Sequence, residues 1–413
     1  MTAEFPNIRH LRAYREVVNT HSISEAAKKV HLSQPAVTQA ISKLEERLGV
    51  TLFSRHSNGL FPTDASNILF HRIERLFEYL TLGSEQANRI AGRGKKEGFS
   101  NFHDLTTATQ LKALIVIAET GNFSMAARSV NLSQPSIHRA ARDLEKLAGF
   151  DFFISNSKGV DLTPAAESFV LQVKLAAAEL RQGLEEIDHF KGKDSSKIYI
   201  GSMPLARTSI LPDAIHTLLQ ETENVQIIAI DGPYPELLKR LRNAELDLLI
   251  GALRNPAPSD DIIQERLFDD PLSIIVGINH PLAKKRNLKI EDTLSYPWIA
   301  PPKEAPAGRY LAEVLRIPDL PNTPVRTVSS SLVLVRGLLT LGNYVTIMSR
   351  HQMSREIDQG LAIPLDIELP DSYRSIGLTY RSDWRATTTQ NRFLDMIRAK
   401  SMVSSPSNAL FKK

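Results

Sequence analysis

The 413-residue sequence contains no cysteine, which excludes disulfide bonds, thiolate nucleophiles and cysteine-bound zinc. It also lacks any apolar run long enough to span a membrane. A secretory signal would not tolerate the early charged residues, which are Glu4, Arg9, Arg12, Arg15 and Glu16. We therefore expect a cytoplasmic protein that makes no membrane contact.

The chain also has little excess of positive over negative charge, because its formal net charge is only +4. Residues 1–100 contain 14 Lys or Arg against 10 Asp or Glu, whereas residues 101–195 contain 10 against 12. A basic excess of this size is usually only a solvated surface. Charge alone therefore does not predict nucleic-acid binding.

The residue patterns of catalytic and metal sites are also missing. Four histidines in the first part of the chain lack metal-ligand spacing, and we interpret most of them as surface residues: His10, His21, His31 and His56. Two aspartate pairs, at 260–261 and 269–270, are interpreted as solvated turns in loops rather than acid/base dyads. No serine has the context of a nucleophile elbow, and no glycine-rich loop suits a phosphate. We expect no catalytic residues, no metal and no cofactor.

A repeat with a period of one hundred residues dominates the first half of the chain. Of the 55 positions from 11 to 65, 20 are identical to their partners one hundred residues later. Leu32-Ser33-Gln34-Pro35 returns as Leu132-Ser133-Gln134-Pro135. A fixed period indicates one structural unit built twice.

Each repeat has the pattern of a helix-turn-helix. Apolar spacing over 8–18 predicts a first helix, and Ser24 is the expected N-cap of a short second helix over 25–30. Ser33 is the expected cap of a third helix that has Pro35 in its first turn and ends at Gly49. Residues 51–63 are typical of a short two-stranded wing.

The third helix is predicted to present polar side chains outward, where amide and guanidinium groups can read base edges in the major groove. In the first unit these are Gln34, Thr38, Gln39 and Lys43, and Arg55 on the wing is expected to reach a phosphate. The alternative is a helical hairpin that only packs or dimerises. It is disfavoured because the cap, the alanine pair, the Ser-Gln-Pro start, the terminal glycine and the wing occur in one order twice.

Each unit continues into a long helix with apolar residues spaced by four and three. This spacing, over 69–90 and 169–190, predicts a coiled-coil seam. Gly83 and Gly183 occupy matching positions, which suggests a close crossing, although a glycine merely tolerated in a helix is the equal alternative. Residues 91–98 and 191–196 have the composition of flexible linkers.

The repeated unit resembles the N-terminal half of LysR-type transcriptional regulators, in which a winged helix-turn-helix precedes a dimerising linker helix. Residues 162–165 match the family's entry into that helix, whereas residues 61–64 depart from it. Gln39 stands where the family usually has Arg, which Arg139 retains. The main departure is the presence of two such units in one chain.

The resemblance, together with the outward-facing positions, implies a set of DNA-binding residues. In the first unit they are Ser33, Gln34, Pro35, Thr38, Gln39, Lys43 and Arg55, and in the second they are Ser133, Gln134, Pro135, His138, Arg139, Arg142 and Lys158. In the family, two chains pair their linker helices so that two heads grip one operator. Here the two long helices could pair within one chain or between chains, and both arrangements stay open.

From Lys197 onward, strands alternate with helices, which predicts a parallel sheet with covered faces. This half resembles the periplasmic-binding-protein-like effector domain of the same regulators. The expected organisation is a first winged helix-turn-helix at 1–65, its linker helix at 66–98, a second winged helix-turn-helix at 105–165, its linker helix at 166–193, an effector domain at 196–400 and a tail at 401–413. Within the effector domain we expect lobe I at about 196–268 and 366–400, and lobe II at about 271–363.

Ligands of open α/β sheets bind at the carboxyl ends of strands. Three stretches have that position, and we expect their residues to contact an effector between the lobes: Ser202, Met203, Leu205, Arg207, Tyr234, Ser329, Ser330 and Ser331. Each stretch could instead be an ordinary turn, and Arg207 could form a surface salt bridge. Hinges are expected near 269–270 and 364–365.

The fold expected is thus two tandem all-α winged helix-turn-helix units with linker helices, followed by an α/β two-lobed domain. The expected function is a transcriptional regulator whose partners are double-stranded DNA, a small-molecule effector, further copies of the chain and RNA polymerase. The competing functions are a cytoplasmic solute-binding module without DNA regulation and an enzyme built on the α/β half. The two helix-turn-helix patterns speak against the first, and the lack of a catalytic set speaks against the second.

Overall fold

A computed structural model of the chain describes residues 5–57, 59–92, 98–157, 159–208 and 210–403. Lys158 and most of the expected linker at 91–98 therefore lie outside the described residues. The chain divides into two compact units, residues 1–197 with 243–245, and residues 198–242 with 246–413. Among the described helices, none combines the length and the apolar character needed to cross a membrane.

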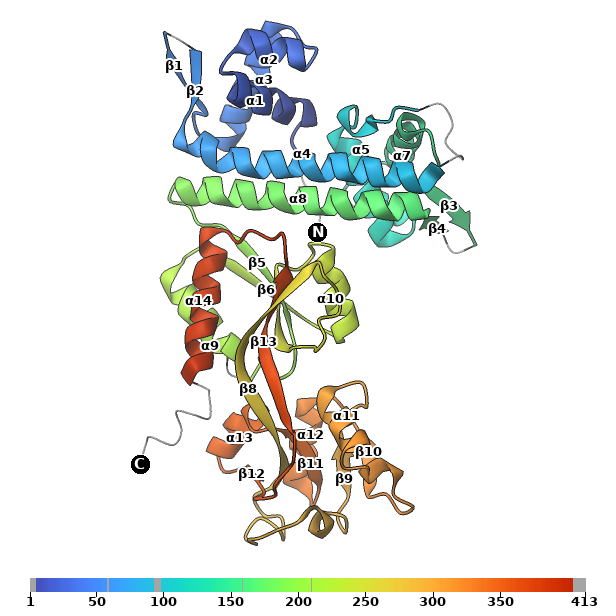
Figure 1. The fold of residues 1–413 in the computed structure, drawn as a ribbon, viewed down its shortest axis with the longest axis vertical. Helices are drawn as coiled ribbons and strands as arrows, with labels where there is room; N and C mark the ends of the chain where they lie inside the picture. Colours follow the sequence, from blue (N-terminus) through green and yellow to red (C-terminus); the bar gives the residue numbers. More distant parts are fainter. Residues whose placement is uncertain (1–4, 58, 93–97, 158, 209, 404–413) are drawn as a thin grey trace. The chain divides into compact units, whose positions relative to one another are not determined.

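The first compact unit contains the same order of elements twice (Figure 1). The first series is α1 (Ile8–Thr20), α2 (Ile23–Lys29), α3 (Gln34–Leu48), β1 (Phe53–His56), β2 (Gly59–Pro62) and α4 (Asp64–Ala91). After the short 3-10 helix η2 (Phe102–Asp104), the second series is α5 (Ala108–Thr120), α6 (Phe123–Ser129), α7 (Gln134–Ala148), β3 (Phe153–Asn156), β4 (Gly159–Leu162) and α8 (Pro164–Phe190). The predicted helices, wing strands and long helices are thus present at the predicted places.

The caps of α3 and α7 are those predicted. The Ser33 side chain accepts a hydrogen bond from the backbone N–H of Ala36, and Gly49 ends the helix in the left-handed conformation with φ 67°. The cap predicted for α2 is wrong by two residues, because Ser22 rather than Ser24 accepts from the N–H of Glu25. Ser22 lies immediately before the first helical residue, the position from which a side-chain oxygen reaches the free N–H groups.

Helices α4 and α8 lie side by side and antiparallel (Figure 1), since Gly83 late in α4 is next to Gln172 early in α8, and Gly183 late in α8 is next to Arg72 early in α4. An added Cβ at Gly83 would lie 2.8 Å from Cβ of Gln172, and one at Gly183 would lie 3.0 Å from Cβ of Arg72. The close crossing suggested by the two glycines is therefore confirmed. The predicted seam is buried along most of its length, but its last members, Ile90 and Phe190, are half exposed.

The second compact unit contains the mixed sheet and its helices (Figure 1). Its strands, in the order β10-β9-β11-β8-β13-β7-β5-β6, with β12 paired to β8, are β5 (Lys197–Ser202), β6 (Gln226–Asp231), β7 (Leu248–Ala252), β8 (Ile262–Gly277), β9 (Trp298–Ala300), β10 (Val325–Val328), β11 (Val345–Ser349), β12 (Ala362–Pro364) and β13 (Tyr373–Arg381). Its α-helices are α9 (Ile210–Glu221), α10 (Tyr234–Arg242), α11 (Pro306–Glu313), α12 (Leu332–Leu341), α13 (Ser354–Asp358) and α14 (Thr388–Val403). Short 3-10 helices are η3 (Ile290–Thr293), η4 (Ile317–Asp319) and η5 (His351–Met353).

The expected parallel sheet is only partly present. Strands β5 and β7 pair in parallel, as do β9 and β10, but β13 pairs antiparallel with both β7 and β8. The 16-residue strand β8 contributes Phe268 to the core of lobe I and Leu272 to that of lobe II. The two lobes are therefore connected by continuous strands rather than by loops.

Two predicted boundaries need correction. Leu365 and Leu369 pack in the core of lobe II, so the chain returns to lobe I after 369 rather than at 364–366. Helix α14 continues through Val403, where the buried Ser401 donates a hydrogen bond to the Arg398 carbonyl. The tail expected from 401 is thus helical at its start, and residues 404–413 lie outside the described residues.

Candidate functional site

Helix α3 presents the predicted polar side chains on the face opposite its core. Gln34, Gln39 and Lys43 are exposed, while Thr38 is half-buried and donates its hydroxyl hydrogen to the carbonyl of Gln34. The Gln34 amide donates to the Ser24 hydroxyl at 3.2 Å, which orients it from helix α2. Three of the four predicted side chains are therefore free to meet a surface outside the protein.

Helix α7 presents a different set on the same face. Gln134, His138 and Arg139 are exposed, and Ser124 donates to the Gln134 side-chain oxygen at 2.9 Å. Arg142 is half exposed, but its guanidinium is 2.7 Å from Glu145, a buried carboxylate. Arg142 is thus already engaged by a carboxylate of its own helix, a pairing that the three-residue spacing in the sequence could have indicated.

The starts of the two helices and the first wing complete the predicted DNA-binding set. Ser33 and Ser133 cap their helices, and Pro35 and Pro135 occupy exposed positions in the first turns. Arg55 is exposed on β1, as a phosphate contact requires. Lys158 lies outside the described residues.

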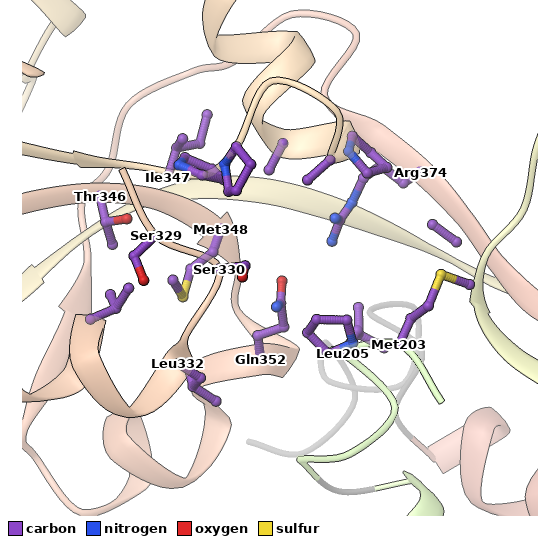
Figure 2. Close-up of a pocket in the computed structure, with 18 of the residues that line it drawn as sticks. Met203, Leu205, Ser329, Ser330, Leu332, Thr346, Ile347, Met348, Gln352 and Arg374 are labelled. Atoms are coloured by element: carbon purple, nitrogen blue, oxygen red, sulfur yellow. The ribbon is translucent and has the colours of Figure 1, made fainter. Parts of the chain in front are cut away.

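A cavity of about 120 Å³ lies between the lobes of the second unit (Figure 2). Of the eight predicted effector residues, four line it: Met203 and Leu205 from lobe I, and Ser329 and Ser330 from lobe II. Most other lining residues are apolar, including Pro301, Pro302, Ala305, Leu332, Val335, Ile347, Met348 and Ile376. The cavity is therefore a mainly apolar space lined by a few polar groups.

The other four predicted effector residues do not line the cavity. Ser202 is buried within β5, and Ser331 caps α12 by accepting from the N–H of Leu334. Arg207 pairs at 3.1 Å with Asp231, and both side chains are exposed, so the surface salt bridge left open for Arg207 is what the structure contains. Tyr234 packs under the guanidinium of Arg254, and its burial raises the pKa of its hydroxyl.

The charged residue of the cavity is Arg374, which sequence reasoning missed. It comes from β13, and Figure 2 shows its guanidinium and the Gln352 amide directed into the same space. Its Nε is buried and has no acceptor among the residues that the structure describes. No local motif marks Arg374, because its position depends on the pairing of β13 with β8.

Asp270 holds the other end of the Arg374 guanidinium. Its side chain is fully buried, and it also accepts from the Ser349 hydroxyl at 2.6 Å and lies 2.7 Å from Nδ1 of His351. The interpretation of 269–270 as a solvated turn is therefore wrong, because both aspartates lie within β8. The network joins β8, β11, η5 and β13 where the chain passes between the lobes.

Comparison with known proteins supplies the family. The model for the bacterial regulatory helix-turn-helix protein, lysR family, matches residues 8–67 and again residues 108–167. The model for the LysR substrate binding domain matches residues 191–401, which is more than half of the chain.

Individual relatives agree with these matches. The HTH-type transcriptional regulator GalR of Pseudomonas putida is 29% identical over 379 residues, 92% of this chain and 93% of that protein. The HTH-type transcriptional regulator PcaQ of Agrobacterium fabrum is 24% identical over 289 residues, 70% of this chain and 93% of its own. A full-length OxyR variant from Pseudomonas aeruginosa has the same fold, with a TM-score of 0.52 and 21% identity over 71% of this chain and 94% of that chain.

The two matched helix-turn-helix segments, the matched effector-binding domain and relatives that are transcriptional regulators rather than enzymes lead to one conclusion. This chain belongs to the LysR family of transcriptional regulators, with a DNA-binding helix-turn-helix region and an effector-binding domain.

Proposed function

We propose that both helix-turn-helix segments are DNA-reading heads, one built on α3 and the other on α7. Two observations support this. Each segment has its own capped recognition helix and its own wing. In addition, the alignment to the Pseudomonas putida relative covers 379 of the 413 residues. The uncovered part is shorter than either matched segment, 8–67 or 108–167, so that relative has counterparts for at least part of each segment.

Each head would read DNA through the exposed side chains of its recognition helix. Gln39 and Arg139 occupy equivalent places and are suited to base edges, the amide to adenine and the guanidinium to guanine. Arg55 on the first wing is suited to a phosphate, which positions the head without reading sequence. Arg142 would first have to leave Glu145, so we give it no part in base reading.

The effector in this proposal is a small, mainly apolar molecule with one anionic group. The cavity, of about 120 Å³, is suited to a small molecule. The proline, leucine and methionine side chains would cover the apolar body, and the buried Arg374 Nε would donate to the anion, because a buried donor without an acceptor costs about 1–3 kcal/mol. Ser329, Ser330 and Gln352 offer further hydrogen bonds.

The observation that carries this function is the occurrence, in one chain, of exposed recognition helices and of a cavity between two lobes. The experiment is a DNA-retention assay on the full chain, with sequences selected from a random library and a panel of small carboxylic acids. Selective retention that one acid changes supports the proposal. Binding of an acid with no DNA retention would favour a solute-binding module instead.

Further copies of the chain are the next partner that we propose. Helix α12 leaves Val333 and Leu341 exposed to 74% and 83%, with Leu334 beside them at 47%. Apolar side chains gathered on one exposed helix often mark a protein contact. Sedimentation of the wild type against a Leu341→Glu variant tests this, and equal masses would refute it. We also propose RNA polymerase as a partner and the cytoplasm as the location, because the family to which the chain belongs regulates transcription.

A further inference from the structure

We propose that one chain holds a complete pair of DNA-reading heads, joined by its own α4 and α8, and that this pair recognises two unlike half-sites. The inference rests on the proposed DNA-reading function of both heads. It goes further by identifying the DNA partner as an asymmetric site rather than a palindrome. It also states that the head pair needs no second chain.

The first support is the distribution of charge across the seam between α4 and α8. Arg72 donates to Glu179 at 2.9 Å and to Glu186 at 2.7 Å, and Arg75 donates to Glu179 at 2.9 Å. Arg72 and Glu179 are almost fully buried, with exposed fractions of 5% and 4%. The two cations thus belong to α4 and the two carboxylates to α8.

This distribution favours α4 paired with α8 over either helix paired with a copy of itself. One hundred residues from Arg72 and Arg75, α8 has Gln172 and Leu175. A pair of α8 helices would therefore bury Glu179 without a cation, and a pair of α4 helices lacks the carboxylates that Arg72 has here. An unpaired buried charge is strongly destabilising, so each like-with-like pair is penalised.

The second support is that each head contacts the segment that follows the long helix of the other unit. At the end of α3, the Lys191 ammonium that follows α8 donates to the Leu48 carbonyl at 2.8 Å. At the end of α7, the N–H of Phe99, in the segment that follows α4, donates to the Leu147 carbonyl at 2.9 Å. Both contacts are made at the end of a recognition helix, although Phe99 lies eight residues beyond the counterpart of Lys191 in the repeat. All of them lie within one compact unit of one chain.

Pairing within one chain also has a concentration advantage. Helix α4 ends at Ala91 and the segment that contacts α7 has begun by Phe99. This short connection joins α4 to the second head, from which α8 continues, and so keeps the two helices at a high effective concentration, on the order of millimolar for short flexible connections. A second chain would have to compete with that concentration.

The two heads differ where they would touch DNA. Position 39 is Gln in the first head, and its counterpart Arg139 carries a guanidinium, so the bases preferred there should be adenine and guanine respectively. Lys43 has Asp143 as its counterpart, which removes a phosphate-binding charge from the second head. Gln34 and Gln134 are shared and contact equivalent serines, but the Gln34 amide donates to Ser24 whereas the Gln134 oxygen accepts from Ser124.

The DNA side is tested by selecting binding sequences for the full chain and for its Gln39→Ala and Arg139→Ala variants. We expect two unlike half-sites at a fixed spacing. Each variant should lose discrimination, by roughly 5- to 150-fold, in a different half-site. A palindromic preferred sequence, or loss of discrimination at the same base by both variants, would overturn the proposal.

The pairing itself is tested with thiols, because the chain has no cysteine of its own. Gln86 on α4 and Ser168 on α8 are 3.2 Å apart at their side-chain oxygens and are only partly buried. A Gln86→Cys/Ser168→Cys chain treated with a short bismaleimide should become bridged at the mass of one chain. The matched control is a mixture of the two single variants, which should give no bridged dimer.

The outcomes separate this inference from the function beneath it. A bridged dimer from the mixed single variants would show pairing between chains and would overturn the intramolecular pair while leaving DNA reading intact. A chain that selects no DNA sequence would overturn the proposed function and the half-sites together. Bridging within one chain would still establish the helix pair in that case.

Discussion

Replacing Arg72 by alanine should strongly destabilise the first compact unit. The guanidinium is bound by Glu179, Gln182 and Glu186, and its removal leaves the 4%-exposed Glu179 carboxylate with Arg75 alone. Breaking a buried ion pair costs about 3–5 kcal/mol, and the remaining Arg75 places the expected loss near the lower value, about 3 kcal/mol. Alanine keeps the Cβ that packs against Gly183, so the helix crossing itself is not altered.

The chain offers two separate probes for this measurement. Both of its tryptophans, Trp298 and Trp384, lie in the second compact unit, so their fluorescence reports that unit, whereas far-UV circular dichroism also follows the helical first unit. A loss of about 3 kcal/mol corresponds to a shift of about 1–3 M in the urea midpoint. We expect that shift in the dichroism transition of the first unit and none in the tryptophan transition.

The control for Arg72→Ala is Lys28→Ala. Lys28 pairs with Glu25 on α2, and with 70% and 56% exposure this pair should contribute at most about 1 kcal/mol. The reasoning would be refuted if Arg72→Ala left the dichroism midpoint within the range of the Lys28 control. It would also be refuted if the tryptophan transition moved by the same amount.

Four further outcomes are expected from the full chain. Arg374→Gln should abolish the effect of the effector on DNA retention but leave basal retention intact. Its control, Arg207→Ala, removes only an exposed ion pair and should change neither quantity. The reverse result would exclude Arg374 from the site. Asp270→Asn should lower the tryptophan-monitored midpoint, because it weakens buried hydrogen bonds worth about 1–3 kcal/mol, and an unchanged midpoint contradicts this. Burial holds the pKa of His103 below its ordinary value of about 6.5, so the first unit should lose stability as the pH falls from that value through the lowered pKa, and a His103→Gln variant should lose less over the same range. Arg55→Ala should weaken binding to every DNA sequence alike and reduce the salt slope by about one, and a sequence-dependent loss would show that Arg55 reads bases.

Most elements of the first unit were predictable because their signals are local. Ser33, Pro35 and Gly49 mark the start and the end of α3 through interactions that reach only three or four residues. The seam residues of α4 and α8 follow from the spacing of apolar residues along one helix. The one misplaced cap, Ser24, lies two residues from a second serine, and local pattern does not decide between two such neighbours.

The candidate effector site was only half predictable. Met203, Leu205, Ser329 and Ser330 follow strands directly, so the rule for strand ends finds them. Asp270 comes from the middle of β8 and Arg374 from the start of β13, and only the antiparallel register of the two strands, with Arg374 opposite Asp270, brings them together. Alternation of apolar and polar residues does not reveal which strands will pair. Local sequence therefore did not distinguish Asp270, in a buried network, from an aspartate in a solvated turn.

The pairing of α4 with α8 was likewise only partly predictable, because the sequence pattern gives the apolar face of each helix but not the helix that packs against it. Sequence spacing predicts that α4 and α8 each have an apolar face, but a helix with Leu69, Ile73 and Leu76 on that face could pack against many helices. The choice of partner depends on where the charges meet, and Arg72 meets Glu179 only in the antiparallel register that the two glycines allow. In this antiparallel pair, position 72 of one helix faces the counterpart of position 79 in the other, so a helix with Arg at the first position and Glu at the second could also pair with its own copy. Here α4 has Arg72 and Tyr79, whereas α8 has Gln172 and Glu179 at the equivalent positions. Each helix supplies only one of the two charges, so this charge complementarity needs one α4 and one α8.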